Sequence, residues 1–134
     1  MPEARPAPPR SYLAFDYGSR RIGVAVGNTL LRRAQPLATI AVTGDAWPAG
    51  VERLLARWQP DALVVGVPLH PDGAPHDNTR RAQRFARRLH GRYGLPVHEV
   101  DERYTTTESL ASGAADVDAA AAALILEQFF REQA

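Results

Sequence analysis

The sequence predicts a single α/β domain built on a mixed β-sheet, and three observations support this fold class. The chain has 134 residues, 45% of them hydrophobic, which suits one core and is too short for two ordinary domains. Residues 61–67 (DALVVGV) form a short continuous apolar run between turn residues, which is typical of a central parallel strand covered on both faces. Residues 47–58 and 78–92 flank this run and carry apolar side chains at helical spacing.

The N-terminal half predicts a tail followed by a β-hairpin. Residues 1–10 are expected to be a flexible tail, because their repeated prolines disfavour both helix and central strand. The domain is then expected to cover residues 11–134. Residues 12–16 and 22–27 read as two strands separated by a short turn, which indicates a hairpin.

The second of these strands has one face made only of small residues. Gly23, Ala25 and Gly27 share this face, so another part of the molecule must approach it closely, and a helix or a third layer can do so. Residues 35–42 supply a third strand.

The remaining elements alternate between helix and strand. Pro48 is tolerated in the first turn of its helix, Asn78 offers a side-chain cap to the next helix, and Gly94 ends that helix. In chain order the sequence predicts helix, strand, helix, strand and two final helices at residues 47–58, 61–67, 78–92, 96–100, 105–112 and 117–131.

Composition excludes several classes of site. The chain has no cysteine, so disulfides, thiolate zinc sites and cysteine nucleophiles are excluded, and a reducing compartment is favoured. There is no signal-type apolar region and no run of apolar residues long enough to span a bilayer, so we expect a cytoplasmic protein with no membrane partner. The net charge is +1, and all sixteen basic residues are arginines. There are two explanations for this usage. Either the base composition of the genome favours arginine codons, or the arginines are selected because a guanidinium can donate two hydrogen bonds to one phosphate.

Two carboxylates follow predicted strands. Asp16 ends the first strand on the same side as Tyr12 and Ala14, in a position where strands disfavour aspartate. It is either a functional group or the acceptor of an Asx-turn. Glu102 directly follows the last strand and is either functional or part of a solvated, salt-bridged turn.

A third carboxylate, Asp118, precedes an alanine run and could serve as a helix N-cap. The carboxyl ends of neighbouring strands converge on one crevice in an open α/β sheet, so Asp16, Glu102 and Asp118 can meet there. Carboxylates held close together repel one another, and a divalent cation relieves that repulsion. Magnesium, with its preference for a few carboxylates, water and phosphate oxygens, suits such a site.

Four ordered motifs resemble one family. The string FDYGSRRIGVAV is similar to the first motif of the YqgF family of pre-16S ribosomal RNA nucleases and Holliday-junction-resolvase-like proteins. The other matches are a central strand and loop (VVGVPL, then DG), a third motif (DERYTT) and a C-terminal helix. In chain order these motifs occupy residues 15–26, 64–69 with 72–73, 101–106 and 117–126.

The resemblance implies a ribonuclease-H-like fold. This is a five-stranded mixed sheet with helices on both faces, in which the first three strands are antiparallel and the last two are parallel to the first. It also implies that Asp16, Glu102 and Asp118 are the catalytic carboxylates and hold a divalent metal, Mg²⁺ or alternatively Mn²⁺. The chain departs from the family pattern at Asn28, where aspartate is frequent, and in the short segment 103–117.

Arginines next to the motifs are the candidate phosphate contacts. Arg21 and Arg103 adjoin metal motifs, and Arg80 and Arg81 are further substrate-binding candidates on an exposed helix face. The four histidines lack the i, i+4 spacing of a zinc site on one helix, so we interpret them as ordinary loop residues. The alternative for His76, in the proline-rich loop, is a role in proton transfer.

The sequence therefore predicts a metal-dependent nuclease acting on structured RNA, most specifically at the 5′ end of pre-16S ribosomal RNA, or on branched DNA. The ribosome is a candidate partner, and we expect a monomer or a weak homodimer. Three alternatives stay open: a Holliday-junction-type DNA resolvase, a non-catalytic nucleic-acid- or ribosome-binding module, and a nucleotide phosphohydrolase. A nucleotide phosphohydrolase would use the hairpin after Asp16 to bind phosphate. Length speaks against it, because the related ATPases enclose their nucleotide between two copies of this core and this chain has one.

Overall fold

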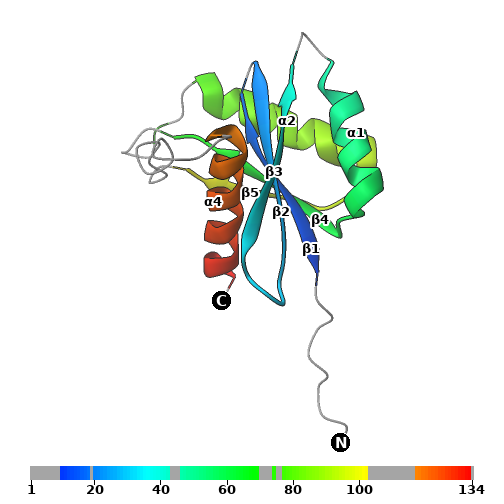
Figure 1. Cartoon of the computed structure of the whole chain (residues 1–134). Helices are drawn as coiled ribbons and strands as arrows, with labels where there is room; N and C mark the ends of the chain where they lie inside the picture. Colours follow the sequence, from blue (N-terminus) through cyan, green and yellow to red (C-terminus); the bar gives the residue numbers. More distant parts are fainter. Residues whose placement is uncertain are drawn as a thin grey trace, which may run out of the picture.

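A five-stranded sheet runs through the centre of the protein, with strand order β3-β2-β1-β4-β5 (Figure 1). The computed structural model describes residues 10–18, 20–42, 46–69, 74, 77–102 and 117–133. Strand β1 pairs antiparallel with β2 and parallel with β4, while β2 and β3 are antiparallel and β4 and β5 are parallel. The strands are β1 (Ser11–Tyr17), β2 (Arg21–Asn28), β3 (Ala34–Ala41), β4 (Ala62–Val67) and β5 (Val97–Asp101). The predicted mixed sheet is confirmed.

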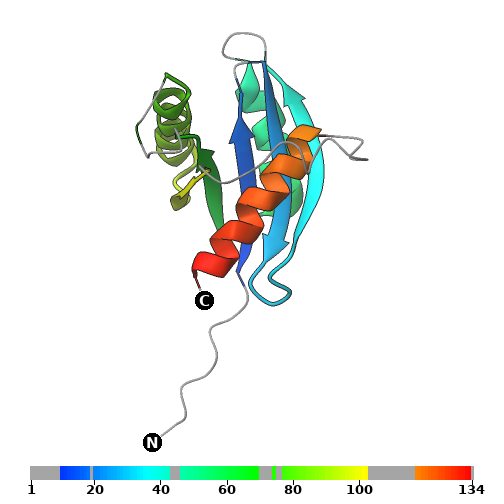
Figure 2. The ribbon, with the colours of Figure 1, turned by 90° about the vertical axis from the view of Figure 1, so that its left-hand side faces the viewer.

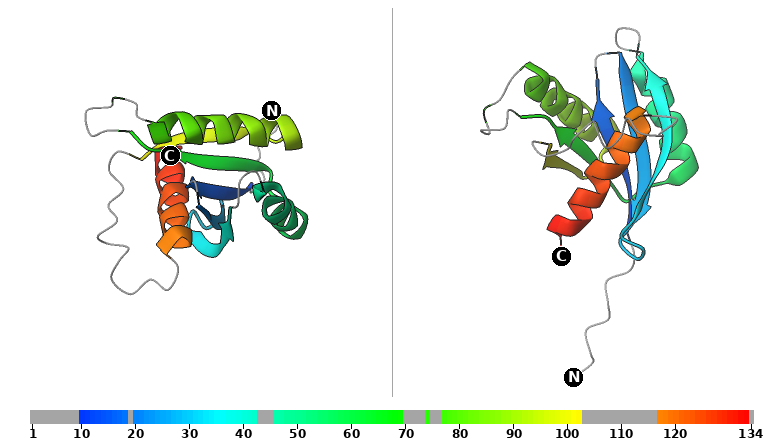
Figure 3. Two further views of the ribbon diagram at one scale, coloured as in Figure 1. Left: turned by 90° about the horizontal axis from the view of Figure 1, so that it is seen from above. Right: turned by 60° about the vertical axis from the view of Figure 1, so that its left-hand side comes forward.

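Helices cover both faces of this sheet, as predicted. Helices α1 (Trp47–Trp58) and α2 (Asp77–Tyr93) pack on one face, and α4 (Val117–Glu132) crosses the other (Figures 2 and 3). Alternation along β1 divides the core: Leu13 and Phe15 face α1 and α2, whereas Tyr12 and Ala14 face α4. No helix in the described part of the chain is long and apolar enough to cross a lipid bilayer.

Most predicted boundaries agree with the structure to within one or two residues. Helix α1 coincides with its prediction, and Gly94 ends α2 with a φ of 68° and a hydrogen bond from its N–H to the His90 carbonyl. Asn78 is not the helix cap, because α2 begins at Asp77 and Asn78 lies inside its first turn. The predicted tail 1–10, except for its last residue, and the predicted helix 105–112 lie outside the described residues.

The small-residue face of β2 lies under α4. A Cβ on Gly27 would come within 3.0 Å of Leu126 Cδ2 and 3.1 Å of Phe130 Cε2, both on α4. Ala25 packs against Ala122 and Ala123 of the same helix. The prediction that a helix approaches this face is confirmed, and the missing side chains on β2 are what allow the approach.

Candidate active site

Two carboxylates lie at the C-terminal edge of the parallel strands. Asp16 is near the end of β1, opposite Gly23 in the β1–β2 register, and the alternation of β1 puts it on the α4 face. Glu102 directly follows β5, and its backbone N–H donates to the Val67 carbonyl at the end of β4 (3.0 Å). Because β1 and β5 both pair in parallel with β4, their ends meet at the same edge. The structure therefore brings these two predicted residues together.

Gly66 makes the space that Glu102 occupies. A Cβ on Gly66 would lie 2.7 Å from Cδ and 2.9 Å from Oε2 of Glu102, and 2.5 Å from Cδ1 of Ile125 on α4. The Glu102 side chain thus lies across β4 beneath α4. Sequence analysis missed Gly66, although a glycine inside an otherwise apolar strand is a signal of close approach.

Gly66→Ala is expected to reduce activity more than stability. The new methyl group displaces the Glu102 carboxylate and the tip of Ile125, both of which are side-chain atoms that can move. We expect a loss of about 1 kcal/mol in the free energy of unfolding, measured by thermal denaturation. Nuclease activity is expected to fall roughly tenfold or more, as supporting contacts of metal sites typically show. Full activity in this variant would mean that the position of Glu102 does not matter.

Asp118 lies in the first turn of α4, where Arg21 holds its side chain. Helix α4 begins at Val117, so Asp118 is inside the helix and the N-cap interpretation is wrong. Arg21 Nε lies 2.9 Å from Asp118 Oδ2, with the two side chains 68% and 30% exposed. An exposed ion pair of this kind contributes at most about 1 kcal/mol to stability. In this structure Arg21, the predicted phosphate contact, orients a candidate metal ligand.

Burial and mutual repulsion raise the pKa values of two of the carboxylates. Burial, and then the negative charge of Asp118, raise the pKa of Asp16 to about 6. Burial, followed by the charges of Asp16 and Asp101, raises the pKa of Glu102 to about 8. Among the described residues no group donates a hydrogen bond to either carboxylate, so the Asx-turn alternative for Asp16 finds no support there. Ionising both groups without a counterion is therefore unfavourable.

These carboxylates fit a divalent cation. Asp16 interacts electrostatically with both Asp118 and Glu102, so it is the central member of the group. Within the described ranges no three carboxylate or imidazole groups surround a single point. Magnesium usually takes one or two protein carboxylates and completes its shell with water and phosphate oxygens. Asp16 and Glu102 are adjacent and half-buried and receive no hydrogen bond from the described residues, so they are suitable ligands for it.

Gln128 on α4 fixes the end of β5 and was not predicted. Its Nε2 donates to the Asp101 carbonyl (2.9 Å) and to Glu132 Oε2 (3.0 Å). The first of these bonds holds the strand that delivers Glu102. Nothing in the local pattern around Gln128 could have indicated a partner on a strand so far away in the chain.

The remaining residues singled out from the sequence either lie away from the carboxylates or fall outside the described residues. Asn28 pairs with Ser11 at the start of β1, so it lies at the opposite end of the sheet from Asp16. There its Oδ1 accepts a hydrogen bond from the Leu31 N–H (2.9 Å), and this departure from the family pattern does not touch the carboxylates. Arg80 and Arg81 are exposed on α2, as predicted. Arg103, His76 and most of the segment 103–117 lie outside the described residues.

Comparison with known proteins identifies the family. A model of the RuvX family, described as Holliday junction resolvase, matches residues 10–132. Two relatives named "Putative pre-16S rRNA nuclease" are each 64% identical over 122 residues. The one from Polaromonas sp. aligns over 91% of this chain and 88% of the relative, and the one from Albidiferax ferrireducens over 91% and 78%. A third of the same name, from Paraburkholderia phytofirmans, is 51% identical over 136 residues, covering 96% of this chain and 91% of the relative.

Solved structures share the fold at low sequence identity. Thermus thermophilus RuvC bound to a Holliday junction aligns with a TM-score of 0.55 at 16% identity, over 92% of this chain and 95% of RuvC. The fowlpox virus Holliday junction resolvase aligns with a TM-score of 0.56 at 14% identity, over 92% of this chain and 99% of the resolvase. These similarities agree with the predicted ribonuclease-H-like fold. From the family match over residues 10–132 and the identity to its relatives, we conclude that the chain belongs to the RuvX (YqgF) family.

Proposed function

We propose that this protein is a divalent-metal-dependent nuclease that hydrolyses phosphodiester bonds in structured RNA, with the 5′ region of pre-16S ribosomal RNA as its substrate. One observation carries the proposal: two half-buried carboxylates, Asp16 and Glu102, repel each other at the C-terminal edge of the sheet, with Asp118 next to Asp16. The substrate is inferred from relatives 64% identical to this chain whose names specify pre-16S rRNA.

Asp16 and Glu102 would hold the cation, with Asp118 beside Asp16 as a third candidate ligand. We propose that the cation is Mg²⁺, with Mn²⁺ as the alternative. Once bound, the cation would supply Lewis acidity toward a phosphate oxygen and a nucleophile that is available at neutral pH. The protein contributes fixed carboxylates: Asp16 is held by a strand paired on both sides, and Glu102 is held by the end of β5. Without a cation, Glu102 keeps a proton on its carboxyl group at neutral pH, since its pKa is about 8.

Arg21 would act on both the site and the substrate. Its guanidinium orients Asp118 and remains 68% exposed, so part of its fork is open to solvent beside the carboxylates. A guanidinium in this position can donate a hydrogen bond to a phosphate oxygen while it stays close to Asp118. Arg103, next to Glu102 in the sequence, is proposed as a second phosphate contact.

The test is cleavage of a precursor RNA that spans the 5′ end of 16S rRNA by the purified protein. We expect cleavage with Mg²⁺, none with a chelator, and none by Asp16→Asn. The matched control is Asp61→Asn. Asp61 lies at the opposite end of β4 and accepts a hydrogen bond from the Ser11 N–H (2.8 Å). An asparagine side chain can accept the same hydrogen bond through its Oδ1. Unchanged cleavage by Asp16→Asn, or no cleavage with any divalent ion, would contradict the proposal, and the second result would favour a non-catalytic binding module.

A DNA resolvase is the second candidate, because the matching family model is described as Holliday junction resolvase. The same protein preparations should therefore be tested on a four-way DNA junction of equal concentration. Faster cleavage of the precursor RNA is the expected result. Preferential, symmetric cleavage of the junction would replace RNA by branched DNA as the substrate while leaving the carboxylate site unchanged.

A further inference from the structure

Positive charge is concentrated on one helix. Helix α2 contains six arginines and one acidic residue, Asp77, which gives it a formal charge of +5. The whole chain has a net charge of only +1, so the rest of the sequence carries −4. The charge is therefore distributed unevenly along the chain, and α2 is the element with the largest positive charge to offer an anionic partner.

The arginines of α2 fall into two groups with different contacts. Arg88 and Arg92 lie over the buried Trp47 ring, 5.1 and 5.8 Å from its centroid, and Arg92 also pairs with Glu52 (3.2 Å). These two arginines join α1 to α2. The other four are exposed and form no ion pair within the described residues: Arg80, Arg81, Arg84 and Arg87. We call these four the arginine face.

The geometry of the arginine face matches an extended anion. Arg80, Arg84 and Arg87 are spaced i, i+4 and i+7, so they form one stripe about 10 Å long on the helix surface. Like charges at this spacing destabilise a helix unless a counter-charge is present. Each strand of a nucleic-acid duplex carries about three phosphates over the same length. A row of phosphates is thus a partner of matching charge and length.

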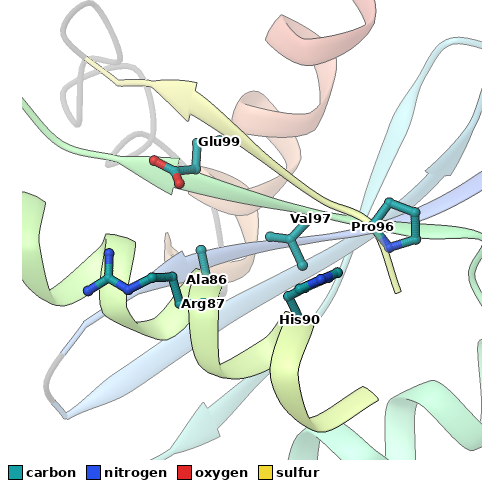
Figure 4. Close-up of a pocket in the computed structure, with 6 residues that line it drawn as sticks. All are labelled: Ala86, Arg87, His90, Pro96, Val97 and Glu99. Carbon is teal, nitrogen blue, oxygen red and sulfur yellow. The ribbon is translucent and has the colours of Figure 1, made fainter. Parts of the chain in front are cut away.

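The arginine face begins at the same edge of the sheet as the candidate active site, but on the opposite face of the sheet. Thr79, at the start of α2, donates a hydrogen bond to the Pro68 carbonyl just after β4, whereas Asp16 and Glu102 lie on the α4 face. Helix α2 follows β4, whose C-terminal end lies beside Asp16 and Glu102, so Arg80 is the member closest to that edge and Arg87 the farthest. Next to Arg87 the surface is concave. A groove of about 580 Å³ lies there between α2 and the edge strand β5 (Figure 4). Arg87 and His90 line its helix side, and Val97 and Glu99 line its strand side.

We propose that the arginine face of α2 binds the sugar-phosphate backbone of a double-helical arm of the RNA substrate, outside the site where the bond is cleaved. The inference rests on the proposed function for the identity of the RNA. Contacts to the backbone position a substrate without reading its sequence, and four guanidinium groups outside the site supply such contacts. Glu99, on the opposite side of the groove, opposes this binding by repulsion.

Binding can be measured without cleavage in an Asp16→Asn background, with a labelled hairpin RNA from the 5′ region of pre-16S rRNA. The test variant is Arg80→Gln/Arg84→Gln/Arg87→Gln. The control is Arg33→Gln/Arg53→Gln/Arg131→Gln, which removes the same charge from three exposed arginines on other elements. We expect the test variant to bind at least tenfold more weakly, with the slope of log K against log salt reduced by about 2 to 3, and the control to lose less than about threefold.

A further variant reverses the sign of the effect. Glu99→Gln is expected to tighten binding about two- to threefold, because it removes a negative charge from the groove. Equal losses in the test and control variants would overturn the inference and assign binding to net charge alone, and a test variant that binds as tightly as its parent would overturn it as well. Thermal melts of both triple variants check that their folds are intact.

The binding assay also separates this inference from the proposed function. RNA that binds through the arginine face but is never cleaved by the wild-type protein contradicts the nuclease proposal and leaves the binding surface in place. RNA that is cleaved in an Asp16-dependent manner but binds independently of the arginine face contradicts only the inference.

Discussion

Replacing Asp16 by asparagine is expected to stabilise the cation-free protein at pH 8 while removing its nuclease activity. Burial and the charge of Asp118 raise the pKa of Asp16 to about 6, so its ionised form destabilises the folded state. Asparagine has nearly the same shape without the charge. We expect a gain of about 1 to 2 kcal/mol in the free energy of unfolding, allowing for solvent screening, and a rise in Tm of roughly 4 °C or more. Cleavage should fall by at least about 100-fold, since even supporting residues of metal sites have effects of that order.

The free energy of unfolding of the cation-free protein is expected to fall as pH rises. A carboxyl group whose pKa is raised in the folded state keeps its proton there after the unfolded chain has lost it, so stability falls as pH rises. For Asp16 the fall extends from its ordinary pKa of 3.8 to about 6, and for Glu102 from 4.5 to about 8. The stability difference between Asp16→Asn and wild type should therefore grow from pH 4 to 6 and persist at pH 8. Thermal melts with a chelator measure it, with Asp61→Asn as control. A destabilised Asp16→Asn protein at pH 8 would show that the carboxylate has a structural role instead.

Gly23→Ala is expected to cause the largest loss of stability. A Cβ on Gly23 would lie 1.8 Å from the Asp118 carbonyl oxygen and 2.9 Å from the Ala119 nitrogen, both backbone atoms of the first turn of α4. Backbone cannot rotate away as a side chain does, so the helix must shift from the sheet and carry the Asp118 carboxylate with it. We expect a loss of about 3 kcal/mol or more and a fall in Tm of roughly 10 °C.

Gly91→Ala is the matched control for that substitution. No atom from outside its own turn lies within 4 Å of the position that its Cβ would take, and Gly91 is exposed in the last turn of α2. Alanine there is expected to raise stability by up to about 1 kcal/mol through helix propensity. Urea or thermal denaturation of the two variants gives the comparison. Equal stability of Gly23→Ala and wild type would contradict the close packing of α4 on β2.

Local patterns predicted the fold well, because they reflect burial. The apolar run at residues 61–67 is buried throughout β4, and the small residues of β2 lie under α4, so both patterns could be interpreted without any knowledge of distant contacts. The structure adds the register that places Asp16 opposite Gly23. The helix starts were harder to predict: Asn78 and Asp118 both have cap-type side chains, yet both lie inside the first turn, because such residues are also common there.

The site was predicted only in its parts. The position of Asp16 and Glu102 at strand ends follows from the pattern, and their meeting follows from the parallel pairing of β1, β4 and β5. The contact of Arg21 with Asp118 joins residues far apart in the chain, and no local signal specifies it. The same holds for the hydrogen bond from Gln128 to Asp101. Residues that position a site through single long-range contacts leave no periodic pattern in the sequence.

The central claim, that Asp16 and Glu102 form a cation site, is tested most directly by isothermal titration of Mg²⁺ or Mn²⁺ into the protein at pH 7 in buffers of different ionisation enthalpy. Glu102 holds a proton at that pH, since its pKa is about 8, and a cation must displace it. We predict one binding event that releases about one proton, and loss of that event in Asp16→Asn and Glu102→Gln. Binding that is unchanged in both variants, or binding to wild type with no proton release, would contradict the account.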